Sequence, residues 1–142
     1  WSWSRGLGDV YKRQPNYIPT GESQAQGEVL ITVASQPVNV TVNQGQTAAF
    51  TVVATTTPSG NTINYQWQKK DYGTDTWINI DGATSSVYTT PVTTQGDGGD
   101  EYRVGLTSTG ATPTLSNAAT LTINIGATTV DNFTPDQIFD DN

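Results

Sequence analysis

The sequence predicts an all-β fold, an antiparallel β-sandwich of about seven strands. Thr, Val and Ile, which favour strands, are abundant, and the 14 Gly and 7 Pro residues supply turns. Apolar residues recur with a period of two, and no segment shows the 3.6-residue period of a helix. Short alternating strands separated by turn residues are typical of a two-layer sandwich.

Seven alternating segments are expected between residues 36 and 125. The clearest has Ile63, Tyr65 and Trp67 on one face and polar residues on the other. Turn residues such as Gly45 and Asp81 separate the segments. The strands are expected at residues 38–42, 50–54, 63–67, 77–80, 87–89, 102–106 and 119–125.

Two similar junctions suggest a tandem arrangement. Residues 29–33 form a short apolar strand followed by small residues, and the strand at 119–125 is followed by a comparable stretch. This weak similarity between the two junctions predicts repeated domains of about 90 residues. On this interpretation, residues 15–35 are the tail of a preceding domain with its linker, and residues 36–125 are one complete domain. Residues 126–142 are then an acidic C-terminal segment.

The first fourteen residues are expected to be foreign to the fold. Residues 4–14 resemble, residue for residue, one translated frame of a transposase adapter used in sequencing libraries. The lack of Met agrees with a processed chain or a fragment of a longer reading frame. The competing interpretation is a natural basic arm. We therefore expect residues 1–14 to be a disordered artefact and set them aside.

Charge and composition exclude several functions. Residues 1–14 hold three of the six basic residues and one of the thirteen acidic ones, which leaves three basic and twelve acidic residues and a net charge of −9. Such a surface repels phosphate backbones, so no nucleic-acid partner is expected. No apolar run approaches the ~18 residues of a membrane helix, so no membrane insertion is expected.

Three motifs, in order, resemble the immunoglobulin-like family. Residues 45–52 (GQTAAFTV), 65–69 (YQWQK) and 97–104 (DGGDEYRV) resemble its second strand, its third strand and the approach to its sixth. The resemblance implies a core of four residues. Val52 and Val104 would replace the usual cysteines, Trp67 would pack across them and Tyr102 would form the tyrosine corner. The five-residue spacing from Asp97 to Tyr102 resembles cysteine-free domains of bacterial surface and phage tail proteins.

No catalytic, metal or cofactor site is expected. The chain has no His and no Cys, so the usual nucleophile–base triads and zinc sites cannot be assembled. The only local carboxylate cluster is Asp97, Asp100 and Glu101, which lies beside glycines. A general acid needs an apolar pocket, and calcium needs about six oxygens in one geometry. We therefore expect a corner turn there, and no enzyme.

Three aromatic residues are candidates for glycan contact. Tyr72, Trp77 and Tyr88 could form a platform for sugar rings. Alternatively, Trp77 and Tyr88 cover the sheet edge, because both lie in strand-like runs with apolar neighbours.

The resemblance implies a non-catalytic module of a phage virion or bacterial surface protein. Such a module would act as a spacer or adhesion domain, with weak, multivalent glycan binding. Its expected partners are cell-surface glycans or neighbouring immunoglobulin-like domains, at the virion or the cell surface. The alternative is a carbohydrate-binding accessory domain of a secreted hydrolase, and the full reading frame would separate the two.

Overall fold

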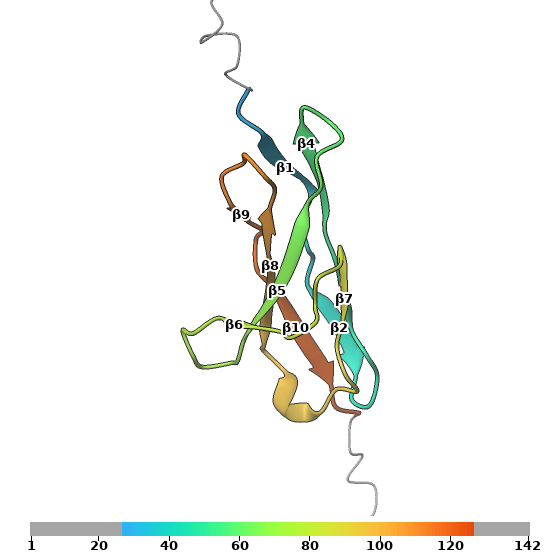
Figure 1. Cartoon of the computed structure of the whole chain (residues 1–142). Helices are drawn as coiled ribbons and strands as arrows, with labels where there is room; N and C mark the ends of the chain where they lie inside the picture. The colour runs from blue at the N-terminus through green and yellow to red at the C-terminus, as the bar shows by residue number, and fades with distance from the viewer. Residues whose placement is uncertain (1–26, 127–142) are drawn as a thin grey trace, which may run out of the picture.

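A computed structural model describes residues 27–126 of the chain. The residues expected to be adapter-derived, residues 15–26 and most of the acidic segment lie outside the described residues. Ten strands and one short 3-10 helix make up the fold (Figure 1). They are β1 (Leu30–Ser35), β2 (Val40–Asn43), β3 (Ala49–Thr51), β4 (Val53–Thr57), β5 (Asn64–Lys70), β6 (Ile78–Asn79), β7 (Val87–Thr89), η1 (Gln95–Asp97), β8 (Glu101–Thr107), β9 (Thr114–Leu115) and β10 (Ala119–Asn124).

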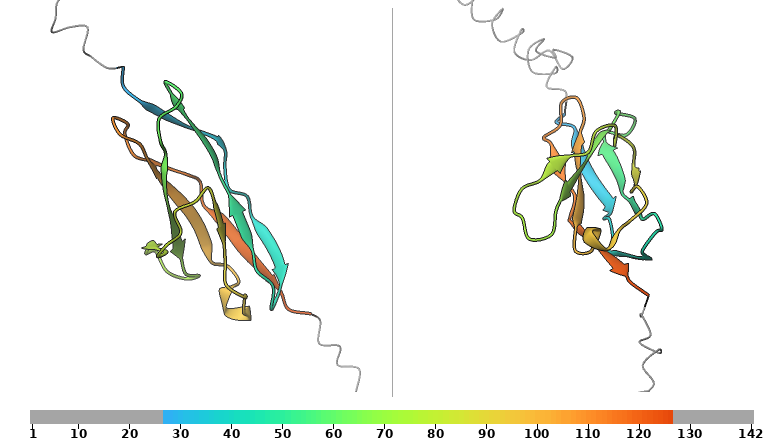
Figure 2. Two further views of the ribbon diagram at one scale, coloured as in Figure 1. Left: turned by 45° about the vertical axis from the view of Figure 1, so that its right-hand side comes forward. Right: turned by 90° about the horizontal axis from the view of Figure 1, so that it is seen from below.

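The strands form two layers, which confirms the predicted all-β sandwich (Figures 1 and 2). One layer is a six-stranded sheet in the order β2-β10-β8-β5-β6, with β9 beside β8. The other layer contains the pairs β1-β4 and β3-β7. These two pairs follow one another along the chain because only Val52 separates β3 from β4. β3 and β4 are thus two pieces of the single strand expected at residues 50–54, whereas β9 matches none of the expected segments.

The first strand corrects the expected domain boundary. β1 pairs antiparallel with β4, from Leu30 opposite Thr57 to Ser35 opposite Val53. Ile31 is 6% exposed and belongs to the core. Residues 30–35 are therefore part of this sandwich and not the tail of a preceding domain. The backbone of a short strand pairs with a free sheet edge, here that of β4, and its apolar face then packs on the core.

The chain then changes layers at a buried proline. Pro37 lies between β1 in one layer and β2 in the other, and proline cannot continue a hydrogen-bonded ladder. The Gln36 side chain accepts a hydrogen bond from Asn117 N at 2.8 Å, and the Asn39 side chain accepts one from Thr120 N at 2.8 Å. These bonds fix the crossing against the approach to β10. β2 can then pair in parallel with β10, with Val40 opposite Leu121.

Two apolar residues that were expected inside the strands at 38–42 and 119–125 lie just outside the observed strands. Val38 is 71% exposed, because it belongs to the crossing and β2 begins only at Val40. Ile125 is 51% exposed, because β10 ends at Asn124. The period-two pattern therefore runs past the true ends of both strands.

Trp67 lies at the centre of the core. It is fully buried, and the other three expected core residues, Val52, Val104 and Tyr102, are at most 3% exposed. Trp67 also packs near Phe50, with ring centroids 6.4 Å apart. Its indole N–H donates a hydrogen bond to Ser85 O at 2.8 Å, so burial leaves no polar atom of the ring unsatisfied.

Replacing this side chain tests the core. Trp67→Ala should lower the free energy of unfolding by roughly 3–5 kcal/mol, because it removes a fully buried aromatic ring. Urea denaturation measures the change. Trp77→Ala is the matched control, because Trp77 lies on the outward face of the sheet and should cost much less. Equal losses in the two variants would contradict the central role of Trp67.

Candidate functional site

A pocket of about 380 Å³ opens between the two layers beside η1. This volume lies within the range typical of small-ligand sites. β5 and β8 contribute residues from one layer, β7 contributes Tyr88 from the other, and the segment leading into η1 closes one side. The lining residues are Lys69, Ile80, Tyr88, Thr90, Pro91, Val92, Thr93, Thr94, Asp97 and Tyr102.

The aromatic core continues into the pocket wall. Tyr102 stacks on Phe50 with ring centroids 4.6 Å apart, and Tyr88 lies 5.7 Å from Tyr102 and 6.1 Å from Trp67. Burial raises the pKa of both pocket tyrosines, Tyr88 and Tyr102. Both hydroxyls therefore remain protonated near neutral pH, where each can donate a hydrogen bond.

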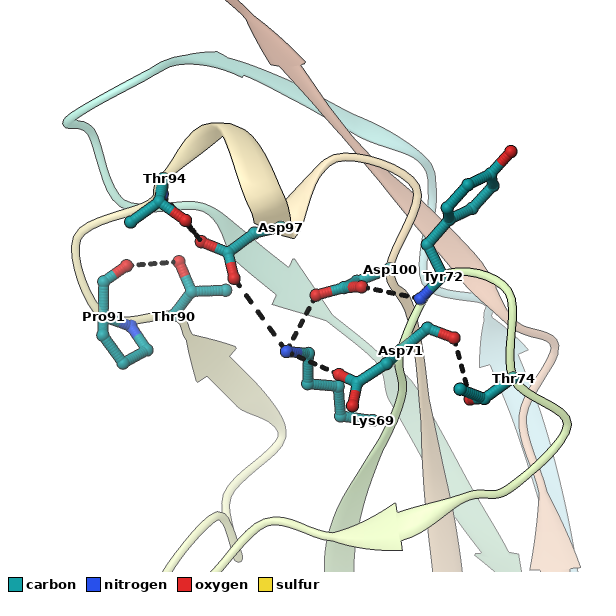
Figure 3. A network of polar contacts seen from close by, with 9 residues as sticks. All are labelled: Lys69, Asp71, Tyr72, Thr74, Thr90, Pro91, Thr94, Asp97 and Asp100. Atoms are coloured by element: carbon teal, nitrogen blue, oxygen red, sulfur yellow. Dashed lines mark hydrogen bonds and ion pairs between the residues drawn. The ribbon is translucent and has the colours of Figure 1, made fainter.

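Lys69, which lines the pocket, lies among three carboxylates (Figure 3). Its Nζ is 2.8 Å from Asp100 Oδ2, 2.9 Å from Asp71 Oδ1 and 4.0 Å from Asp97 Oδ1. Burial disfavours the charged ammonium, but hydrogen bonds to Asp100 and Asp71 outweigh it and raise the pKa of Lys69. Asp100 is buried, and it also accepts a hydrogen bond from Tyr72 N at 2.9 Å.

Asp97 ends η1 with its carboxylate turned back on the start of the helix. Asp97 Oδ2 accepts hydrogen bonds from Thr94 N at 2.7 Å and from Thr94 Oγ1 at 2.9 Å. The backbone bond is the main cause of the lowered pKa of Asp97. Because the folded pKa is depressed, this carboxylate stabilises the fold above its ordinary pKa, and the contribution is lost as the pH falls. Its other oxygen, Oδ1, faces Lys69.

The turn after η1 requires a glycine. Gly99 has φ +94°, and a Cβ there would come within 2.6 Å of Tyr72 Cδ2. The Tyr72 ring covers Gly99 and points away from Lys69 (Figure 3), although 76% of the residue remains exposed. This close contact holds the β5–β6 connection against the segment that carries Asp100.

The carboxylate cluster differs from the one the sequence suggested. Asp97 and Asp100 do come together, but Glu101 pairs with Lys70 at 3.1 Å and Asp71 takes its place. Among residues 27–126, no group of three acidic side chains could hold a metal ion. Sequence reasoning missed Lys69. Its position on the same face as Trp67 was the available signal, because a lysine facing a core needs carboxylate partners.

The three aromatic candidates for glycan contact lie in different places. Tyr88 lines the pocket, whereas Tyr72 lies over Gly99. Trp77 lies against two cations of the large sheet, with the Arg103 guanidinium carbon 4.1 Å and Lys70 Nζ 5.5 Å from its ring centroid. Only Tyr88 therefore contributes to a concave site.

Comparison with solved structures identifies the fold. The N-terminal Ig1-2 module of the Drosophila receptor protein tyrosine phosphatase DLAR matches with a TM-score of 0.50 at 20% sequence identity, over 70% of this chain and 51% of that one. The chain has an immunoglobulin-like fold. The IG1+IG2 structure of DIP-gamma (TM-score 0.49, 12% identity, 68% and 49% coverage) and titin domain M7 (0.45, 20%, 67% and 94%) are further neighbours.

These likenesses concern the fold alone. The chain spans about half the length of the DLAR and DIP-gamma structures that it matches. No protein-family model matches the sequence, and no curated protein matches it significantly. Within residues 27–126, no helix is long and apolar enough to cross a membrane.

Removing the Lys69 ammonium should destabilise the η1 end of the immunoglobulin-like sandwich. Lys69→Met leaves the buried Asp100 carboxylate without its cation, at a cost of about 1–3 kcal/mol, less than for a fully buried pair because Lys69 is partly exposed. Urea denaturation measures the loss. Lys70→Met is the matched control, since its partner Glu101 is more exposed than Asp100. A loss no larger than the control's would contradict the structural role of the cluster.

Stability should fall in alkaline solution. The folded pKa values of Tyr88, Tyr102 and Lys69 all lie above their ordinary values of 10.0 and 10.5. The unfolded chain therefore releases these protons first, and the free energy of unfolding decreases as the pH rises past those ordinary values. Urea midpoints measured between neutral and strongly alkaline pH test this. The variant Tyr88→Phe with Tyr102→Phe should show a shallower decrease, and an unchanged slope would contradict the assignment.

Proposed function

We propose that the chain is a non-catalytic immunoglobulin-like module of a phage virion or bacterial surface protein. It acts as a spacer and adhesion domain at the virion or cell surface, where it is linked end to end with neighbouring domains. It contacts surface glycans weakly.

The observation that carries the spacer role is the position of the two ends of the fold. β1 begins at one end of the elongated sandwich, and β10 finishes at the other (Figures 1 and 2). Domains that are entered and left at opposite ends add length when they are linked in series. The long axis of the sandwich then becomes the axis of the array.

The strand pairing supports the same role. β1 pairs antiparallel with β4 along five residue pairs, and β2 pairs in parallel with β10 along four. Tension along the long axis pulls β2 and β10 in opposite directions, so their hydrogen bonds are loaded together and not one at a time. A domain held in this way resists extension, which a spacer between two surfaces requires.

The distribution of charge supports adhesion to neutral partners. Every charged residue from 29 to 126 lies either between residues 69 and 81 or between residues 97 and 103. The strands β1, β2, β3, β4, β7, β9 and β10 therefore carry no charged side chain. Uncharged hydroxyl and amide side chains on these strands can approach neutral glycans or other copies without burying a charge.

Pulling on the domain in two directions tests the spacer role. The chain has no native cysteine, so handles can be attached at chosen positions. Gly27→Cys with Gly126→Cys loads the long axis, whereas Gly27→Cys with Ser59→Cys loads two points at the same end and opens the β1–β4 pair. We expect a clearly larger unfolding force along the axis, measured by optical tweezers. An axial force equal to or below the same-end force would contradict the proposal.

A further inference from the structure

An incomplete set of hydrogen bonds lies at the polar end of the pocket. A lysine ammonium has three N–H donors, and Lys69 directs two of them to Asp100 and Asp71. Its third neighbour, Asp97 Oδ1, is 4.0 Å away, beyond hydrogen-bond distance. The hydrogen bonds to Thr94 use the other oxygen of Asp97. One donor and one acceptor therefore face each other across a gap.

Two tyrosine hydroxyls of the same pocket are available to an occupant. Tyr102 is 3% exposed and lines the pocket, yet within residues 27–126 its Oη takes part in no side-chain hydrogen bond. Tyr88 is half-buried and lines the pocket from the facing layer. Among residues 27–126, the buried side-chain oxygen or nitrogen without a partner is Ser108 Oγ and not a tyrosine oxygen. The two tyrosine hydroxyls are therefore open to the pocket, where each can bond a polar occupant.

We propose that the pocket binds one ring of a neutral sugar, with a ring hydroxyl bridging Lys69 and Asp97. This assignment deepens the adhesive part of the proposed function and rests on it. A hydroxyl oxygen placed about 2.8 Å from each atom spans the gap, because it can accept from the ammonium while it donates to the carboxylate. The hydroxyls of Tyr88 and Tyr102 can donate further hydrogen bonds to oxygen atoms of the sugar.

The rest of the pocket suits the apolar face of a sugar. Ile80, Pro91 and Val92 line it together with the two tyrosine rings, and Val92 is 65% exposed. Sugar rings carry C–H groups on one face and hydroxyls around the edge, so a pocket with one apolar and one polar side matches both.

Charge selects neutral sugars over acidic ones. Three carboxylates, those of Asp71, Asp97 and Asp100, surround the single ammonium of Lys69. A sugar carboxylate placed in the pocket would meet this excess of negative charge at short range. Uronic and sialic acids should therefore bind more weakly than neutral hexoses.

Titration of the full chain with free sugars tests the proposal. Methyl glucoside, methyl galactoside and N-acetylglucosamine are the neutral probes, and glucuronic acid and N-acetylneuraminic acid are the acidic ones. Backbone amide shifts in nuclear magnetic resonance spectra report the site. We expect saturable, millimolar binding of at least one neutral probe, with shifts at Thr93, Thr94 and Asp97, and weaker binding of both acidic probes.

Two variants separate this pocket from other surfaces. Tyr102→Phe keeps the ring that stacks on Phe50 but removes the hydroxyl, and it should weaken binding roughly tenfold. Tyr72→Phe is the matched control, because Tyr72 lies outside the pocket, and it should leave the affinity unchanged. Unfolding curves show that both variants are folded before they are titrated.

Three outcomes would overturn the proposal. The first is no binding of any neutral probe up to about 100 mM, which would mean that water alone satisfies the polar groups. The second is binding with shifts centred on Trp77 and Arg103. The third is equal loss of affinity in Tyr72→Phe and Tyr102→Phe. The pulling experiment involves no sugar, so the spacer role and the sugar site can fail separately.

Discussion

The burial of Trp67 between the two layers is the interaction on which the rest of the molecule depends. Its ring lies near Phe50 and Tyr88, which come from the opposite layer, and its N–H is satisfied by Ser85. Tyr88 and Tyr102 extend this cluster to the pocket. The pocket wall is therefore a continuation of the core, and its tyrosine rings have the fixed positions that core packing imposes.

The interior and the ion cluster meet on a single strand. Trp67 and Lys69 are two residues apart on β5, so they face the same side of the sheet. Trp67 packs between the layers, whereas Lys69 lines the pocket at the η1 end of the sandwich. A charge can be kept on this face only because η1 and the turn at Gly99 bring Asp97 and Asp100 to it. The local shape of that connection thus decides the electrostatics of the pocket.

Much of the fold was predictable because period-two patterns report which face of a strand is buried. The resemblance to immunoglobulin-like domains added the four core positions Val52, Trp67, Tyr102 and Val104, and all four are buried. The periodicity argument has a limit. It failed where the answer depended on which sheet a strand joins. Residues 30–35 carry the same pattern whether they pair with β4 or with another domain. The meeting of Lys69 with Asp71, Asp97 and Asp100 depends on turn conformation, which side-chain periodicity does not encode.

Val52 and Val104 affect the conditions under which the chain can fold. They stand where the family resemblance implies cysteines. No disulfide joins the two layers, so folding needs neither an oxidant nor a disulfide isomerase. The domain can therefore reach its folded form in a reducing compartment. After forced extension it can also refold without waiting for thiol chemistry.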